Sequence, residues 1–126
     1  MRAETKKYLY DIREACGRIL QYTADKSLDD YSADSLLRSG VERQIEIIGE
    51  ATNLLSKIDP ELAASIPGHE RMIAMRNRLI HGYSSVDDGI VWTCLTVDSK
   101  QVFSSTRFLR PGGWSSAPDI MTKKST

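Results

Sequence analysis

The segment from about residue 32 to 57 carries the longest helical pattern in this 126-residue chain. Its stripe repeats every three or four positions, the spacing that places side chains on one face of an α-helix, and it comprises Leu37, Val41, Ile45, Ile48, Thr52 and Leu55. Gly40 and Gly49 lie inside the segment, although glycine costs a helix about 1 kcal/mol relative to alanine. They therefore predict either that another helix approaches closely or that this helix bends.

Four further segments carry helical signals, and they cover residues 4–22, 60–65, 69–82 and about 89 onward. Asp29, Asp30 or Ser32 could each cap the long helix, and Asp87 and Asp88 could cap the last one. No sustained strand alternation is present along the sequence. The pattern predicts an all-α fold, an antiparallel helical bundle of four to five helices.

The helical pattern weakens beyond Asp98. Four apolar residues could continue it: Val102, Phe103, Phe108 and Leu109. Residues 110–126 are rich in glycine, proline and serine, a composition typical of disorder. We therefore expect one helical domain over residues 1–109, followed by a disordered and atypical tail over residues 110–126.

Charge and cysteine usage narrow the classes of function. Lysine plus arginine and aspartate plus glutamate number 17 each, so any RNA binding must come from a local patch rather than an overall field. Cys16 and Cys94 are isolated, which argues against a zinc site. Neither a signal peptide nor an apolar run of membrane-spanning length is present. We expect a cytoplasmic protein with free thiols and with no metal or other cofactor.

The segment MRNRLIHGY, residues 75–83, is unusually polar for the end of a bundle helix. On a helix with 100° per residue, three residues share the core-facing side: Met72, Met75 and Leu79. Asn77 and His81, four residues apart, share a face directed away from the core, and Arg78 is also outside the apolar stripe. A lone histidine or arginine on such a face is usually a solvated surface residue.

The combination of residue types nevertheless suggests chemistry on a phosphate. Arg76 offers a fork of donors suited to phosphate, and histidine can exchange a proton near neutral pH. Asn77 could orient the imidazole of His81 or hold a ribose hydroxyl. In RNA cleavage, a histidine would take the 2′-hydroxyl proton while an arginine stabilises the extra charge on the phosphate.

The same segment resembles a known family. RNRLIHGY, Arg76 to Tyr83, matches the signature of HEPN-domain toxins of the HepT type, in which Arg and His are separated by four residues and Tyr follows after one more. Two flanking segments are also similar to that family, Arg43–Ser56 and Val86–Trp92, so the resemblance covers about residues 4–98. His69 departs from it because relatives often carry tryptophan there, and the chain beyond Asp98 departs as well.

The resemblance implies a homodimeric helical bundle that cleaves RNA without a metal ion. Arg76 and His81 would be catalytic and would line a cleft between two subunits, with Asn77 and Arg78 in supporting or substrate-binding roles. The resemblance also implies a toxin–antitoxin pair with an MntA-like nucleotidyltransferase. This partner would silence the toxin by AMPylation of Tyr83, which places bulk and negative charge where RNA phosphate must lie.

Two other functions remain open on the sequence. The chain could be a non-catalytic HEPN module that binds a nucleotidyltransferase and a nucleotide or other substrate, with the motif serving as a phosphate-binding surface. Alternatively, it could be a structural dimerisation bundle in which the motif has no role. RNA cleavage by the purified protein separates the first hypothesis from these two.

Overall fold

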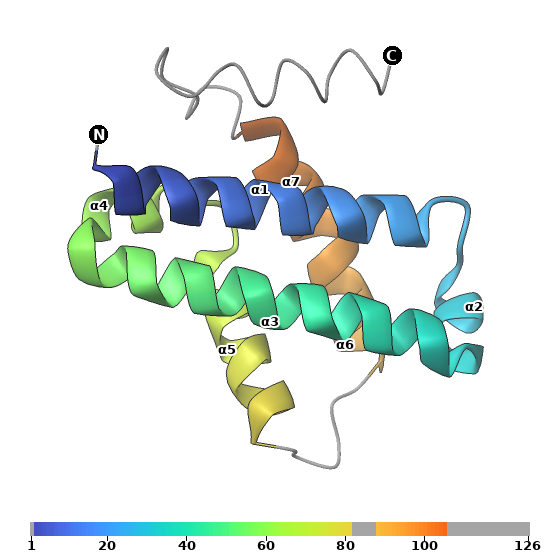
Figure 1. The fold of residues 1–126 in the computed structure, drawn as a ribbon. Coiled ribbons are helices and arrows are strands. Elements are labelled where there is room, and N and C mark those ends of the chain that lie inside the picture. The colour runs from blue at the N-terminus through green and yellow to red at the C-terminus, as the bar shows by residue number, and fades with distance from the viewer. Residues whose placement is uncertain (1, 82–87, 106–126) are drawn as a thin grey trace.

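A computed structural model describes residues 2–81 and 88–105. All regular structure in these ranges is helical, which confirms the predicted all-α fold class. The elements are α1 (Ala3–Thr23), α2 (Leu28–Ala33), α3 (Ser35–Ile58), α4 (Pro60–Ala64), α5 (His69–Ile80), α6 (Asp88–Thr93), a π-helical turn η1 (Cys94–Asp98) and α7 (Ser99–Ser105). Figure 1 shows α1 and α3 side by side in opposite directions, crossed by α5 and by the α6–α7 segment.

The core lies between these four main elements and includes the predicted stripe of α3. Ile12 and Ile19 of α1 are fully buried, as are Val41, Ile45 and Leu55 of α3. The buried Thr52 is compatible with this apolar face because its hydroxyl donates to the Ile48 carbonyl oxygen at 2.6 Å. The amphipathic pattern of α3 therefore predicted the face of this helix that is buried.

The caps at the start of α3 differ from the prediction. Asp34, rather than Asp29, Asp30 or Ser32, caps α3, and its Oδ1 accepts from the N–H groups of Leu36 at 3.0 Å and Leu37 at 3.1 Å. Because the preceding residues form the short helix α2, α3 begins at Ser35 and not near residue 32.

Ser27 and Asp30 form a reciprocal capping box that accounts for this shift. The Asp30 N–H donates to the Ser27 Oγ at 3.1 Å, and the Ser27 N–H donates to the Asp30 Oδ2 at 2.9 Å. Hydrogen bonds from the Ser27 backbone and then from its side chain hold the pKa of the Asp30 carboxyl below its usual value. Asp30 therefore stabilises α2 and leaves Asp34 as the acceptor for α3.

The chain continues as a helix beyond Asp98, although the helical pattern of the sequence weakens there. Helix α7 continues to Ser105, and its Val102 is fully buried. Asp88, expected as a cap, is instead the first residue of α6, while its neighbour Asp87 lies outside the described residues. Residues 106–126 also lie outside them, so the domain limit at residue 109 and the disordered tail stay predictions.

Helices α3 and α5 approach each other closely at Gly49. A Cβ atom added there would lie 2.3 Å from the Cβ of Arg76 and 3.0 Å from the carbonyl oxygen of Met72. The close approach predicted from the glycines is therefore confirmed at Gly49. At Gly40, an added Cβ would only touch the Tyr22 ring at 3.6 Å, an ordinary contact.

The two glycines should respond oppositely to alanine. We expect Gly49→Ala to lower the free energy of unfolding by about 1–3 kcal/mol, because α5 must move to admit the methyl group. Gly40→Ala should leave stability unchanged or raise it by up to about 1 kcal/mol, because alanine is the better helix former. Urea denaturation followed by circular dichroism measures both, and equal stability of Gly49→Ala and the wild type would contradict the close contact.

Candidate functional site

Helix α5 carries the polar motif and is anchored at its N-terminal end by a buried carboxylate. Asp98, from the π-helical turn η1, is 1% exposed and binds Arg71 through both of its oxygens. The Arg71 Nε lies 2.8 Å from Oδ2 and its Nη2 lies 2.6 Å from Oδ1. Gly68 precedes α5 with a φ of 71°, and a Cβ there would lie 2.5 Å from the Asp98 Cγ. The start of α5 is therefore packed directly on this carboxylate.

The core-facing side of α5 is the one predicted from its helical map. Met72 and Met75 are buried, and Leu79 is half-buried. Asn77, Arg78 and His81 are all exposed on the remaining surface. The outward direction predicted for these three side chains is confirmed.

Arg76 lies against α3, and its guanidinium is held from two directions. Its Nη2 donates to the Glu50 Oε1 at 3.0 Å, and its Nη1 donates to the Asn77 Oδ1 at 3.1 Å. The Arg76 side chain is 22% exposed, whereas the Glu50 side chain is 50% exposed. The Arg76 Nε is buried and has no hydrogen-bond partner within the part of the chain that the structure describes. The close approach at Gly49 thus places a largely covered cation beside an accessible carboxylate.

His81 forms the C-cap of α5, one turn beyond Asn77. Its backbone N–H donates to the Asn77 carbonyl oxygen at 3.0 Å, so the helix ends directly at the imidazole-bearing residue. The Asn77 side chain contacts Arg76, a role for which the sequence alone offered no signal. Arg76 and His81 are therefore presented by the last turns of one helix.

Glu50 is the site residue that the sequence did not identify. The only available hint is its position next to Gly49, the glycine that marks the close helix contact. Tyr83 falls in residues 82–87, outside the described residues, so its proposed modification stays a prediction.

The chemistry available at this end of α5 is that of a guanidinium and an imidazole. A guanidinium can neutralise a phosphate through two parallel N–H donors, and an imidazole can accept or donate a proton near neutral pH. Across the described ranges, the structure contains no group of three His, Cys, Asp or Glu side chains placed to hold a metal ion. None of the helices there combines the length and apolar character required to cross a bilayer.

The Glu50–Arg76 contact can be tested without an activity assay. In Glu50→Ala the Arg76 Nη2 loses its acceptor, and we expect faster exchange of the Arg76 Nη2 hydrogens with water, observed by NMR. Stability should change by less than about 1 kcal/mol, because half-exposed ion pairs contribute little. The control Glu46→Ala removes a carboxylate that pairs instead with Arg43. Unchanged exchange in Glu50→Ala would show that Glu50 does not hold Arg76.

Comparison with known proteins identifies a family and individual relatives to which this chain is similar. Residues 12–107 match the family model described as "Ribonuclease HepT-like". The chain is 36% identical over 98 residues to "Probable ribonuclease HepT" of Thermococcus cleftensis, covering 78% of this chain and 88% of the relative. It is 30% identical over 99 residues to "Putative RNase MJ1380" of Methanocaldococcus jannaschii, covering 79% and 90%. No solved structure matches the chain. The family match includes α7, so it extends past the Asp98 limit of the resemblance seen in the sequence.

Proposed function

The chain belongs to the HepT-like ribonuclease family, and from that membership we propose that it cleaves RNA without a metal ion, with Arg76 and His81 as catalytic residues. The observation that supports these two residues is the guanidinium of Arg76, fixed beside Glu50 and Asn77, on the helix that ends at the exposed His81.

In the proposed reaction, His81 accepts the proton of the ribose 2′-hydroxyl as that oxygen attacks the adjacent phosphorus. The bond from phosphorus to the 5′ oxygen breaks, and that oxygen takes up a proton as it leaves. The products are a 2′,3′-cyclic phosphate and a 5′-hydroxyl. Each terminal nitrogen of Arg76 has a second N–H beyond its bond to Glu50 or Asn77, and these can donate to the phosphate. The charge that develops on the phosphate is thereby stabilised.

Two subunits would complete the site. We place Arg76 and His81 at a cleft between the members of a homodimer, as the family resemblance implies. The exposure of Asn77, Arg78 and His81 supports this placement, because these side chains are available to a second subunit or to RNA. Asn77 supports Arg76, and Arg78 contacts the RNA backbone.

Purified protein should cleave RNA, and Arg76→Ala or His81→Ala should lower kcat/KM by about 100-fold or more, the usual contribution of a proton-transfer residue. The rate is measured on a labelled RNA oligonucleotide.

Matched controls come from the same chain. His69→Ala removes the second histidine, at the opposite end of α5, and Arg2→Ala removes an exposed arginine at the start of α1. Both should cleave RNA like the wild type. If His81→Ala and His69→Ala are equally active, His81 is not the base.

Regulation by a partner enzyme is the second part of the proposal. A MntA-like nucleotidyltransferase, acting as antitoxin, would transfer AMP from ATP to the Tyr83 hydroxyl and release pyrophosphate. The added phosphodiester would stand two residues from His81 and repel RNA phosphate. The chain would then be the toxin of a toxin–antitoxin pair.

Co-expression with such a nucleotidyltransferase should add one or more AMP units to the protein, detected by intact-mass spectrometry. Tyr83→Phe should remain unmodified and keep its ribonuclease activity beside the partner. The control Tyr22→Phe, at a surface-exposed tyrosine of α1, should be modified normally. Modification that persists in Tyr83→Phe would contradict the assignment of the acceptor.

A further inference from the structure

A cleft of about 410 Å³ lies where the end of α1 meets α6, η1 and α7. Thr23 and Lys26 line one side, and Trp92, Thr96 and Lys100 line the other. This volume is in the range of small-molecule sites, which extends from about 300 to 1,000 Å³. The proposed catalysis at Arg76 and His81 uses none of these residues.

Trp92 gives the cleft an aromatic wall with a defined orientation. The side chain is half-buried, and its ring centroid lies 5.5 Å from that of Tyr31 at an interplanar angle of 45°. Tyr31 itself is fully buried, so it supports the Trp92 ring from the core. A fixed aromatic ring at an open cleft is the element on which single-stranded nucleic-acid binders stack bases.

Two lysines give the same cleft a positive edge. Lys26 and Lys100 are exposed, and neither takes part in an ion pair among the described residues. Asp25 also lines the cleft, so two ammonium groups face one carboxylate. The whole chain has a net charge of zero, so binding of RNA phosphate depends on a local group of positive charges. Lys26 and Lys100 form such a group.

Two hydroxyl groups in the cleft are set to accept hydrogen bonds. The Thr23 hydroxyl donates to the Ile19 carbonyl oxygen at 2.8 Å, and the Thr96 hydroxyl donates to the Trp92 carbonyl oxygen at 2.8 Å. Since each hydroxyl proton is used within its own helix, the oxygen lone pairs remain as acceptors. Ribose hydroxyls and base N–H groups are donors of the matching kind.

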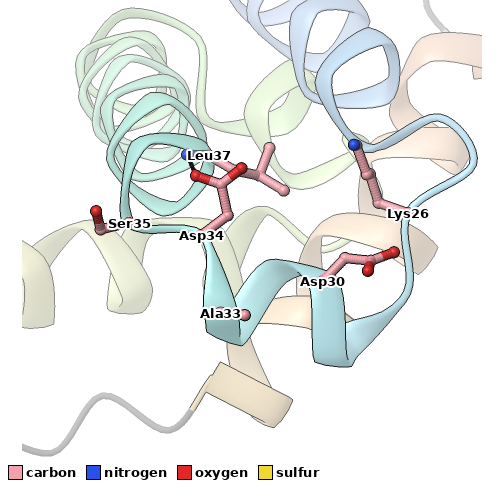
Figure 2. Close-up of a pocket in the computed structure, with 6 residues that line it drawn as sticks. All are labelled: Lys26, Asp30, Ala33, Asp34, Ser35 and Leu37. Carbon is pink, nitrogen blue, oxygen red and sulfur yellow. Dashed lines mark hydrogen bonds between the residues drawn. The ribbon is translucent and has the colours of Figure 1, made fainter.

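A neighbouring pocket also contains Lys26 but is lined by neither an aromatic ring nor a second lysine. That pocket, of about 490 Å³, shares Lys26 but has Asp30 and Asp34 in its wall, as Figure 2 shows. Both carboxylates accept hydrogen bonds at helix N-termini. A phosphate is therefore repelled on that side of Lys26 and attracted on the Trp92 side.

We propose that the cleft between Trp92, Lys26 and Lys100 binds a nucleotide of single-stranded RNA, with its base on Trp92 and its phosphate between the lysines. This inference rests on the proposed function, because it assigns the RNA a second contact outside the catalytic residues. The cleft would set the affinity for RNA and His81 the rate of cleavage.

Tryptophan fluorescence tests the cleft directly. The chain has two tryptophans, so Trp114→Phe leaves Trp92 as the single reporter, and His81→Ala in the same chain prevents cleavage during titration. A short unstructured RNA oligonucleotide should quench this fluorescence. Adding Lys26→Ala and Lys100→Ala should raise Kd about tenfold or more. The slope of log Kd against log salt concentration should fall by about 0.7, since the lysines neutralise one phosphate and each neutralised phosphate contributes about 0.7 for a single strand.

The control pair Lys6→Ala and Lys57→Ala removes the same charge away from the cleft and should leave Kd and the salt slope nearly unchanged. Absence of quenching, or equal Kd values for the two pairs, overturns the inference. If the wild type does not cleave RNA but the cleft variants still lose binding, the proposed catalysis fails and the cleft stands. If cleavage is normal and the Lys26 and Lys100 variants keep the wild-type KM, the cleft alone is wrong.

Discussion

The missing side chain at Gly49 is the constraint on which the rest of the molecule depends. Any Cβ there would overlap the Cβ of Arg76 at 2.3 Å, so α3 and α5 can meet at this distance only across a glycine. The contact packs α5 against α3 beside the buried side chains of Met72 and Met75. It also places the Arg76 side chain next to Glu50, the residue that follows the glycine. One backbone contact thus sets both the helix packing and the position of the guanidinium.

A second contact holds the N-terminal end of α5. Asp98 is almost fully buried, and a buried carboxylate is costly unless it is paired and hydrogen-bonded. Arg71 satisfies both of its oxygens, while the left-handed Gly68 leaves room for the carboxylate at the helix start. Helix α5 is therefore held at its beginning by an ion pair and in its middle by the glycine contact. Arg76 lies at the glycine contact itself, and His81 follows it at the exposed C-terminal end of the helix.

The sequence predicted the features that follow from local periodicity. It did not predict a capping box or the contacts between residues far apart along the chain. The stripe of α3, the outward direction of Asn77 and His81, and the close approach at Gly49 all follow from spacing and residue size. The cap of α3 was wrong because Ser27 and Asp30 form their own capping box, which periodicity does not reveal. The extent of the helix beyond Asp98 stayed open in the sequence, because Asp98 reads as a polar break until Arg71, 27 residues away, is seen to pair with it. Glu50 was missed for the same reason, since its partner is 26 residues distant.

We propose that the glycine contact positions Arg76 for catalysis, and RNA cleavage by Gly49→Ala tests this positioning. Cleavage is compared with that of Gly40→Ala at a temperature where circular dichroism shows both variants to be folded. We expect Gly49→Ala to lose at least about tenfold in kcat, because a displaced reacting group forfeits orientation, while Gly40→Ala keeps the wild-type rate. A folded Gly49→Ala protein that cleaves RNA at the wild-type rate would contradict it.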